Sequence, residues 1–221
     1  MANPVNRRRP RAHTGEQAAE IAIFAATEQL LASHALHDLS VAQIIKAAEI
    51  SRASFYHYFS SKFEVVAALM GRIFDEMYSD TQTTLESHWD DPGESLRSSL
   101  RTAMATWFEH RAVINATLEN MHAVPALAEV WSTAKSRFAA ALVEQITRER
   151  EQGRAGEGLA PEAIAELLVC GAERIFYVGS NGIEARLATP EEELDAIVTV
   201  SLAAIYGAPL GPLAPATGSR A

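Results

Sequence analysis

Cysteine is nearly absent from this 221-residue sequence, which contains only Cys170. A single cysteine excludes an intramolecular disulfide, and no cysteine and histidine cluster has the spacing of a zinc site. The sequence also lacks a glycine-rich phosphate loop, an H-E-x-x-H motif and a G-x-S-x-G motif, and its seven histidines are scattered. We therefore expect neither an enzyme nor a metal or cofactor site.

Long apolar runs are missing as well. The stretch 196–219 carries no charge, but glycine and proline interrupt it repeatedly, so we expect no membrane-spanning helix. Residues 1–15 contain four arginines and no apolar segment after them, a composition unlike that of a secretory signal. Together with the lone cysteine, these features favour a reducing, cytoplasmic location.

Positive charge is scarce, and the N-terminal part holds more than its share of it. The whole chain has a formal net charge of -9. Residues 1–62 hold seven basic and five acidic residues, whereas the remainder holds 12 basic and 23 acidic residues. A basic segment attached to an acidic body is typical of a protein that meets a polyanion with one end only. A basic tail that serves solubility is the alternative.

Alternation with period two is also absent, whereas apolar residues recur at helical spacing along the chain, so we expect an all-α fold with about nine helices. Capping residues and first-turn prolines mark the helix starts. The predicted helices span residues 16–33, 41–49, 52–58, a long segment from about 62, 94–109, 112–122, 125–152, 161–180 and 190–206. We assign 1–15 to a disordered basic arm, 16–62 to a three-helix domain, 63–207 to a second helical domain and 208–221 to a disordered tail.

The segment 51–62 contains the most informative pattern. Ser40 and Ser51 precede two short helices separated by a three-residue turn, which is the helix-turn-helix arrangement. Phe55 and Phe59, four residues apart, form an inward face. The outer face carries side chains that suit phosphates and base edges in the major groove, namely Arg52, Ser54, Tyr56 and His57. Taken alone, the same pattern also fits a small aromatic core.

Four short motifs lie within residues 21–69: Leu39-Ser40-Val41, Ala47-Ala48, Ile50-Ser51-Arg52 and the run from Phe55 to Lys62. Together they closely resemble the DNA-binding domain of the TetR family of transcriptional regulators. The segment from Ala128 to Thr133 and the sequence Ile205-Tyr206-Gly207 are similar to the ethionamide-resistance repressor (EthR) subgroup of that family. The resemblance implies an N-terminal helix-turn-helix domain joined to a C-terminal helical domain for ligand binding and dimerisation.

By this resemblance, the chain is a homodimer whose partner is double-stranded DNA with an inverted-repeat operator. The implied DNA-binding residues lie on the recognition helix and on nearby helix starts: Ser40, Ser51, Arg52, Ala53, Ser54, Tyr56, His57 and Lys62. Helix N-termini offer unpaired N–H groups and a positive dipole end to phosphate, which supports these positions independently. The arm residues Arg7, Arg8, Arg9 and Arg11 either attract phosphates without reading the sequence or reach into the minor groove.

One residue departs from the family pattern. Glu49 stands where the family usually has the glycine of the turn. A left-handed conformation there is unfavourable by about 1 kcal/mol for a residue with a side chain. Either the turn differs from that of the family, or Glu49 pairs with Lys46 or Arg52. A carboxylate at this place would be repelled by DNA phosphate.

The resemblance also implies a small, mostly apolar effector that releases a repressor from DNA. The implied effector-binding residues are largely apolar or aromatic: Leu100, Met104, Trp107, Trp131, Phe138, Val169, Glu173 and Phe176. Aromatic residues at helical spacing fit a filled core equally well. Glu173 and Arg174 either orient a polar group of the ligand or lie on a solvated or dimer-facing edge.

Small and apolar residues on the last two predicted helices suit a four-helix interface between two chains: Gly171, Ile175, Ile197 and Ala204. One alternative remains for the chain as a whole. It is a helical ligand-binding or scaffolding protein without DNA binding, which the acidic body and Glu49 favour.

Overall fold

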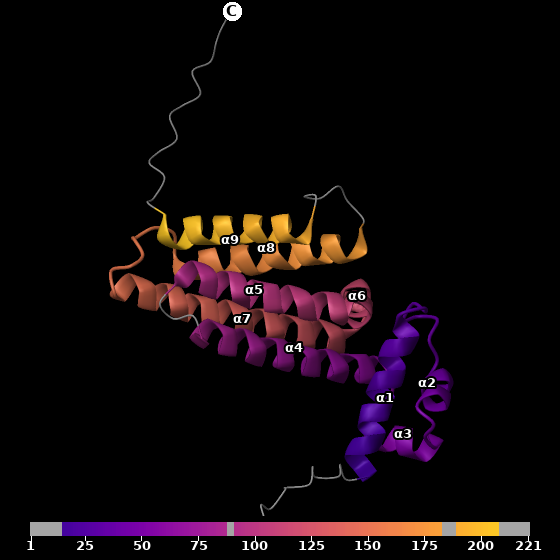
Figure 1. Cartoon of the computed structure of the whole chain (residues 1–221). Coiled ribbons are helices and arrows are strands. Elements are labelled where there is room, and N and C mark those ends of the chain that lie inside the picture. Colours follow the sequence, from indigo (N-terminus) through magenta and orange to yellow (C-terminus); the bar gives the residue numbers. More distant parts are fainter. Residues whose placement is uncertain (1–14, 88–90, 183–188, 208–221) are drawn as a thin grey trace, which may run out of the picture.

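The structure is a computed structural model that describes residues 15–87, 91–182 and 189–207 (Figure 1). Within these ranges the chain forms nine α-helices and no strand, which confirms the predicted all-α class. The helices are α1 (Gly15–Leu31), α2 (Val41–Ala47), α3 (Arg52–Tyr58), α4 (Lys62–Ser87), α5 (Pro92–Glu109), α6 (Arg111–Asn120), α7 (Pro125–Glu151), α8 (Pro161–Asn181) and α9 (Pro190–Tyr206). Residues 1–14 of the predicted arginine arm and the predicted C-terminal tail lie outside the described residues, whereas Gly15, assigned to the arm, is the first residue of α1.

Local chemistry fixes most of the helix starts. The side chains of four N-cap residues accept backbone N–H groups of the first turn: Ser40, Ser51, Asp91 and Thr189. Four helices begin with a proline, which lacks the N–H that would be unpaired there: Pro92, Pro125, Pro161 and Pro190. The predicted start of α5 at residue 94 is late by two residues, because Asp91 and Pro92 form its cap and first position.

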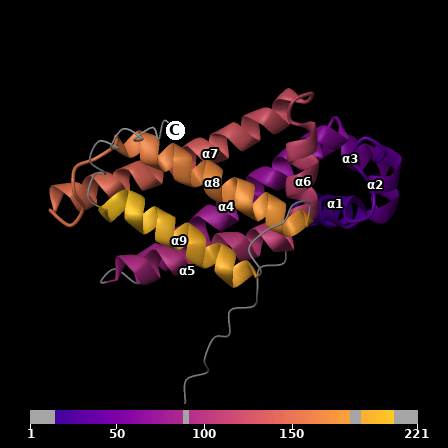
Figure 2. The same ribbon diagram turned by 90° about the horizontal axis from the view of Figure 1, so that it is seen from above.

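The helices are arranged in two regions that α4 connects (Figure 1). Helices α1, α2 and α3 form a small group at one end, which we call the N-terminal unit. Helices α4 to α9 form an elongated body, in which α5, α7, α8 and α9 run lengthwise beside α4 (Figures 1 and 2). The short helix α6 lies at the junction and contacts α1, α4 and α7. The unit and the body are therefore joined by α4 and α6.

One apolar core continues through both regions. In the N-terminal unit, Ile23, Ile44 and Phe55 are completely buried. Helix α4 adds Val65 and Val66, also completely buried, and its following turns reach into the body. Since the same helix contributes to both packing regions, a displacement of α4 in the body changes the contacts that hold the N-terminal unit.

Candidate functional sites

Helix α3 has a packed inner face and a polar outer face. Phe55 is completely buried, and the ring of Phe59 lies 6.2 Å from it, centroid to centroid. Ser51 caps the helix by accepting the N–H of Ser54 at 3.0 Å. The predicted recognition residues Arg52, Ala53, Tyr56 and His57 are exposed, and Ser54 is half-buried. The structure therefore gathers these side chains on one exposed surface.

Arg52 and Tyr56 are neighbours on this surface. The guanidinium carbon of Arg52 lies 5.4 Å from the centroid of the Tyr56 ring, one helical turn along α3. Tyr56 is 47% exposed, which is unusual for so large a side chain in this protein. A cation and a phenol side by side on an exposed helix suit contacts to phosphates and base edges.

The start of α2 is held against the start of α4 by Lys62. Ser40 forms a complete capping box, in which its N–H donates to Gln43 Oε1 at 2.8 Å and its Oγ accepts the N–H of Gln43 at 3.3 Å. In the loop before it, the carbonyls of His37 and Leu39 accept hydrogen bonds from Lys62 Nζ at 2.9 and 2.7 Å. Lys62, predicted from the family to contact phosphate, therefore also orients the exposed Ser40. Its contact with DNA stays a prediction.

Glu49 has the left-handed backbone conformation that the resemblance to the TetR family predicts for this turn. Its φ angle is 53°, and within the described ranges it is the only residue other than glycine with a positive φ. The N–H of Glu49 donates to the Lys46 carbonyl at 3.4 Å and that of Ile50 to the Ile45 carbonyl at 3.3 Å, the pattern of a Schellman motif. No ion pair joins Glu49 to Lys46 or Arg52, although all three residues are described. The left-handed turn expected from the family is therefore present. The backbone is strained at Glu49, and the side chain of Glu49 is exposed.

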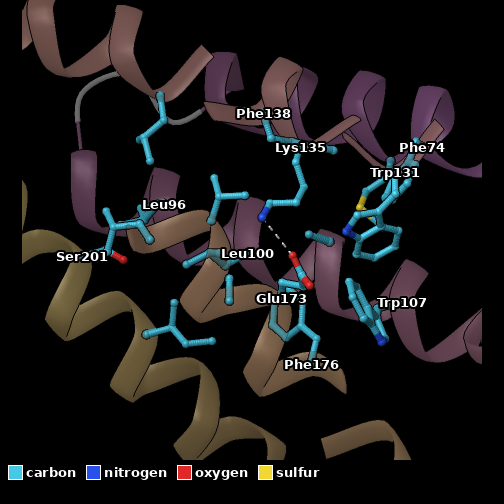
Figure 3. A pocket seen from close by; sticks show the side chains of 17 residues that line it. Phe74, Leu96, Leu100, Trp107, Trp131, Lys135, Phe138, Glu173, Phe176 and Ser201 are labelled. Atoms are coloured by element: carbon cyan, nitrogen blue, oxygen red, sulfur yellow. Dashed lines mark ion pairs between the residues drawn. The ribbon is translucent and has the colours of Figure 1, made fainter. Parts of the chain in front are cut away.

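A cavity of about 150 Å³ lies inside the body between α4, α5, α7, α8 and α9 (Figure 3). Seven of the eight predicted effector-binding residues line it: Leu100, Trp107, Trp131, Phe138, Val169, Glu173 and Phe176. Ten further residues complete the wall: Phe74, Met77, Leu96, Ala103, Lys135, Leu142, Leu168, Ala172, Ile197 and Ser201. Nearly all of this wall is carbon, as the apolar composition of the predicted set implied.

Met104 is the eighth predicted residue, and it is buried in the core rather than placed at the cavity wall. Helix α5 turns about 100° for each residue. Leu96, Leu100, Ala103 and Trp107 therefore share one stripe, while Met104 lies further round the helix. Met104 was included because of the resemblance to the family, and not because of its helical spacing.

Aromatic rings form one end of the cavity. The ring centroid of Trp131 lies 5.2 Å from that of Phe74 and 5.9 Å from that of Trp107, and Trp107 lies 5.8 Å from Phe176. The indole Nε1 of Trp107 is buried and has no hydrogen-bond partner among the described residues. Figure 3 shows Leu96 and Ser201 away from this aromatic end, with Lys135 and Glu173 between.

Lys135 and Glu173 bring charge to the cavity wall. Lys135 Nζ lies 3.5 Å from Glu173 Oε2, and the two side chains point toward each other (Figure 3). The same ammonium donates to Cys170 Sγ at 3.1 Å and lies 3.8 Å from Glu166 Oε1. The hydrogen bond to Cys170, with the negative charge of Glu173, raises the pKa of Lys135 above its ordinary value. The lysine is therefore protonated at neutral pH.

Comparison with known proteins shows the family of this chain. Residues 23–69 match the family model described as bacterial regulatory proteins of the tetR family, and residues 96–207 match the C-terminal domain of the transcriptional regulator EthR. The HTH-type transcriptional regulator EthR of Mycobacterium tuberculosis is 32% identical over 190 residues, which cover 85% of this chain and 87% of that protein. The chain belongs to the TetR family of transcriptional regulators.

A further relative and a solved structure are also similar to this chain. The EthR regulator of Mycolicibacterium smegmatis is 29% identical over 188 residues, covering 85% of this chain and 86% of that protein. The solved SmeT–triclosan complex superposes with a TM-score of 0.71 at 20% identity, covering 90% of this chain and all of that one, and so shares the fold. As a member of this family, the chain is a helix-turn-helix regulator that binds DNA, and not an enzyme.

Two polar residues of the TetR-family cavity were missed from the sequence. Lys135 follows Trp131 by four residues and precedes Phe138 by three, so helical spacing places all three on one face of α7. That signal was available, but a lysine in an apolar stripe is usually assigned to the helix edge. Ser201 faces the cavity from α9 through the same spacing, four residues after Ile197.

Membrane-spanning helices and clusters of metal-ligating residues can be assessed only for the part of the chain that the structure describes. Among the described residues, no helix is long and apolar enough to cross a membrane. In the same ranges, no group of three or more histidine, cysteine or acidic residues is arranged to hold a metal ion.

Proposed function

We propose that this protein is a homodimeric, cytoplasmic repressor that binds an inverted-repeat operator and is released by a small, mostly apolar effector. The observation that carries the proposal is the connection between two sites through one helix. Helix α4 contacts α1 of the N-terminal unit and adds the buried Val65 and Val66 to the common core, and Phe74 and Met77 of the same helix line the cavity. An occupant of the cavity that shifts α4 therefore shifts the N-terminal unit as well.

The DNA-binding part of the proposal rests on the exposed face of α3 and on the caps beside it. Arg52, Tyr56 and His57 would read DNA from α3, while Ser40 and Ser51 would place helix N-termini against phosphate. The arm residues 7–11 lie outside the described part of the chain, and their contribution to phosphate binding stays a prediction.

The effector part rests on the apolar cavity and on an adjoining pocket. A larger pocket of about 310 Å³ shares Leu96, Leu100, Ala103, Phe138, Leu142 and Val169 with the cavity wall. The shared wall places the two hollows side by side, so together they offer a small molecule more room than the cavity alone. A protein of the same fold has been solved in complex with triclosan, which supports the view that the fold accommodates small molecules.

A second connection between the two sites runs through His110. Trp107 lines the cavity, and His110, three residues later, ends α5. The His110 Nδ1 atom lies 2.6 Å from Glu28 Oε1 of α1 in the N-terminal unit. We propose that movement of Trp107 by an effector is transmitted to α1 through this contact. A bound effector then favours a spacing of the two N-terminal units that no longer matches the operator.

Dimerisation is assigned to α8 and α9. Large apolar side chains are exposed on both helices, with Leu167 at 67% and Val200 at 61% exposure, and Gly171 and Ala204 are exposed near them in sequence. Ile197, which the sequence suggested for this interface, is buried and lines the cavity instead. Exposed apolar residues on two adjacent helices suit an isologous four-helix interface.

The experiment that tests the function is selection of bound DNA from a random duplex pool by the full chain at near-physiological salt, where weak non-specific binding fades. We expect an inverted repeat with half-site centres about 34–36 Å apart, or a longer multiple. Arg52→Ala should weaken binding to the selected site by about tenfold or more. Arg101→Ala, on the body, removes the same charge and should have little effect.

A folded, dimeric protein that enriches no sequence would contradict the repressor proposal. The chain would then be a helical ligand-binding protein without sequence-specific DNA binding. Equal losses from Arg52→Ala and Arg101→Ala would show that binding depends on net charge alone.

A further inference from the structure

The carboxylate of Glu173 has unused hydrogen-bonding capacity at the cavity wall. The side chain is 26% exposed overall, but its Oε2 atom is buried and accepts no hydrogen bond among the described residues. The ion pair with Lys135 Nζ, at 3.5 Å, neutralises part of its charge without supplying a well-placed proton. A buried carboxylate oxygen of this kind is stabilised by any ligand that brings a donor to it.

The charges around this oxygen are unbalanced. The ammonium of Lys135 is shared between Glu173 and Glu166, which lie 3.5 and 3.8 Å from it. Within the described residues no other cationic side chain lines the cavity. Because Lys135 divides its charge between Glu173 and the more exposed Glu166, the charge of Glu173 at the wall is only partly balanced, which favours a cationic donor over an anionic group.

The aromatic end of the cavity suits the same kind of ligand. Trp107, Trp131 and Phe176 stand edge to face around it, with centroid separations of 5.9 and 5.8 Å. Ring edges and faces of this kind pack against another aromatic ring, and their faces also attract a cation. The cavity volume of about 150 Å³ is the size that accommodates one benzene-sized ring.

We propose that the cavity is selective for a compact aromatic amine in its protonated form, and that Glu173 Oε2 accepts a hydrogen bond from the ammonium group. The proposal rests on the effector cavity of the proposed function and specifies the chemistry of its ligand. The ring lies against Trp107 and Trp131. Lys135 stays in contact with Cys170 and Glu166, while the ammonium group of the ligand forms an ion pair with Glu173.

The test uses three probes of matched size: benzylamine, benzyl alcohol and benzoate. Each is titrated into the full chain at neutral pH, with calorimetry and with tryptophan fluorescence, because Trp107 and Trp131 line the cavity. We expect benzylamine to bind about tenfold more tightly than benzyl alcohol, the factor typical of a charge-assisted hydrogen bond, and benzoate to bind most weakly.

Two variants assign the selectivity to the carboxylate. Glu173→Gln keeps the shape of the side chain. It should weaken the binding of benzylamine by about tenfold and change the affinity for benzyl alcohol by less than about threefold. Lys135→Met removes the cation that competes for Glu173. It should strengthen the binding of benzylamine but not that of benzyl alcohol. Glu129→Gln, at an exposed position on α7 away from the cavity, is the matched control and should change neither.

Three results would overturn the inference. If benzyl alcohol or benzoate binds as tightly as benzylamine, the amine preference is wrong, while the effector cavity stands. If Glu173→Gln weakens all probes equally, Glu173 has a structural role only, and the melting temperature of the variant would show it. If no probe binds, both the ligand class and the effector cavity are contradicted, whereas DNA selection still tests the repressor function separately.

Discussion

The N-terminal unit and the body differ in how completely side chains fill the space between their helices. In the N-terminal unit, α2 and α3 have only seven residues each, and the rings of Phe24, Phe55 and Phe59 pack with centroid distances of 5.7 and 6.2 Å. The body is built from long helices with large aromatic residues, yet a cavity of about 150 Å³ remains between five of them. The unit is therefore suited to hold a fixed surface, and the body to change its packing when the cavity is occupied.

The largest effect should come from emptying the filled core. Phe55→Ala removes a completely buried ring, and we expect a loss of about 3–5 kcal/mol of unfolding free energy, with loss of DNA binding. Phe138→Ala in the body should cost clearly less, because one side of its ring already faces the cavity. Urea denaturation of both variants measures the two losses of unfolding free energy. A larger loss for Phe138→Ala would contradict the contrast between the two regions.

The next effect concerns the lysine that orders the loop before α2. Lys62→Met retains much of the apolar stem but removes the hydrogen bonds to His37 and Leu39, so we expect about 1.5–3 kcal/mol of destabilisation. Lys46→Met is the control, since Lys46 is exposed on the neighbouring α2. Weaker DNA binding in Lys62→Met with unchanged urea stability would show that Lys62 acts on phosphate alone.

Enlarging one alanine in each region compares their free space directly. Ala26→Leu in α1 overfills a packed site, since Ala26 is only 5% exposed, and should cost about 1–3 kcal/mol. Ala103→Leu points into the cavity and should change stability by less than about 1 kcal/mol while blocking the benzylamine probe. The measurements are thermal or urea unfolding and probe titration. Similar destabilisation by both substitutions would mean that the cavity is not available to a side chain.

A smaller effect is expected at the strained turn of the N-terminal unit. Glu49→Gly relieves the positive φ of 53° and should add about 0.4–1 kcal/mol of stability. It should also tighten operator binding, because the carboxylate near the phosphates is removed. Glu49→Gln separates the two causes: it keeps the strain, so only DNA binding should improve. Unchanged stability in Glu49→Gly would show that the turn relaxes at no cost.

The smallest effect is a pH dependence at the far end of the body. Glu149 accepts a hydrogen bond from Arg154 Nε at 2.8 Å, and this contact lowers the pKa of Glu149 below 4.5. A lowered pKa in the folded state means that the stabilisation is present above about pH 4.5 and is lost as the pH falls through the folded-state value. Glu149→Gln should therefore flatten the fall of unfolding free energy below pH 4.5, measured by urea titration, whereas exposed Glu129→Gln should leave it unchanged.

The fold and the exposed face of α3 could be predicted closely because their signals are local. Ser40, Ser51 and Thr189 lie at helix starts, and proline opens four helices, so the boundaries follow from short-range chemistry. The position of Glu49 in the family motif predicted an unusual turn there. The positive φ angle of Glu49 agrees with this prediction. The ion pairs offered as its explanation did not form, because nothing in the motif fixes where an exposed side chain points.

The amino-acid sequence by itself determined the helices, their caps and the aromatic composition of the body, since these depend on residues three or four positions apart. Only the tertiary structure decided that the aromatic stripes enclose a cavity, that Ile197 faces inward, and that Met104 lies beside the wall. It also brought Lys135 of α7 within 3.5 Å of Glu173 of α8. The physical reason is that a gap between helices depends on how several faces meet in space, which no single stretch of sequence records.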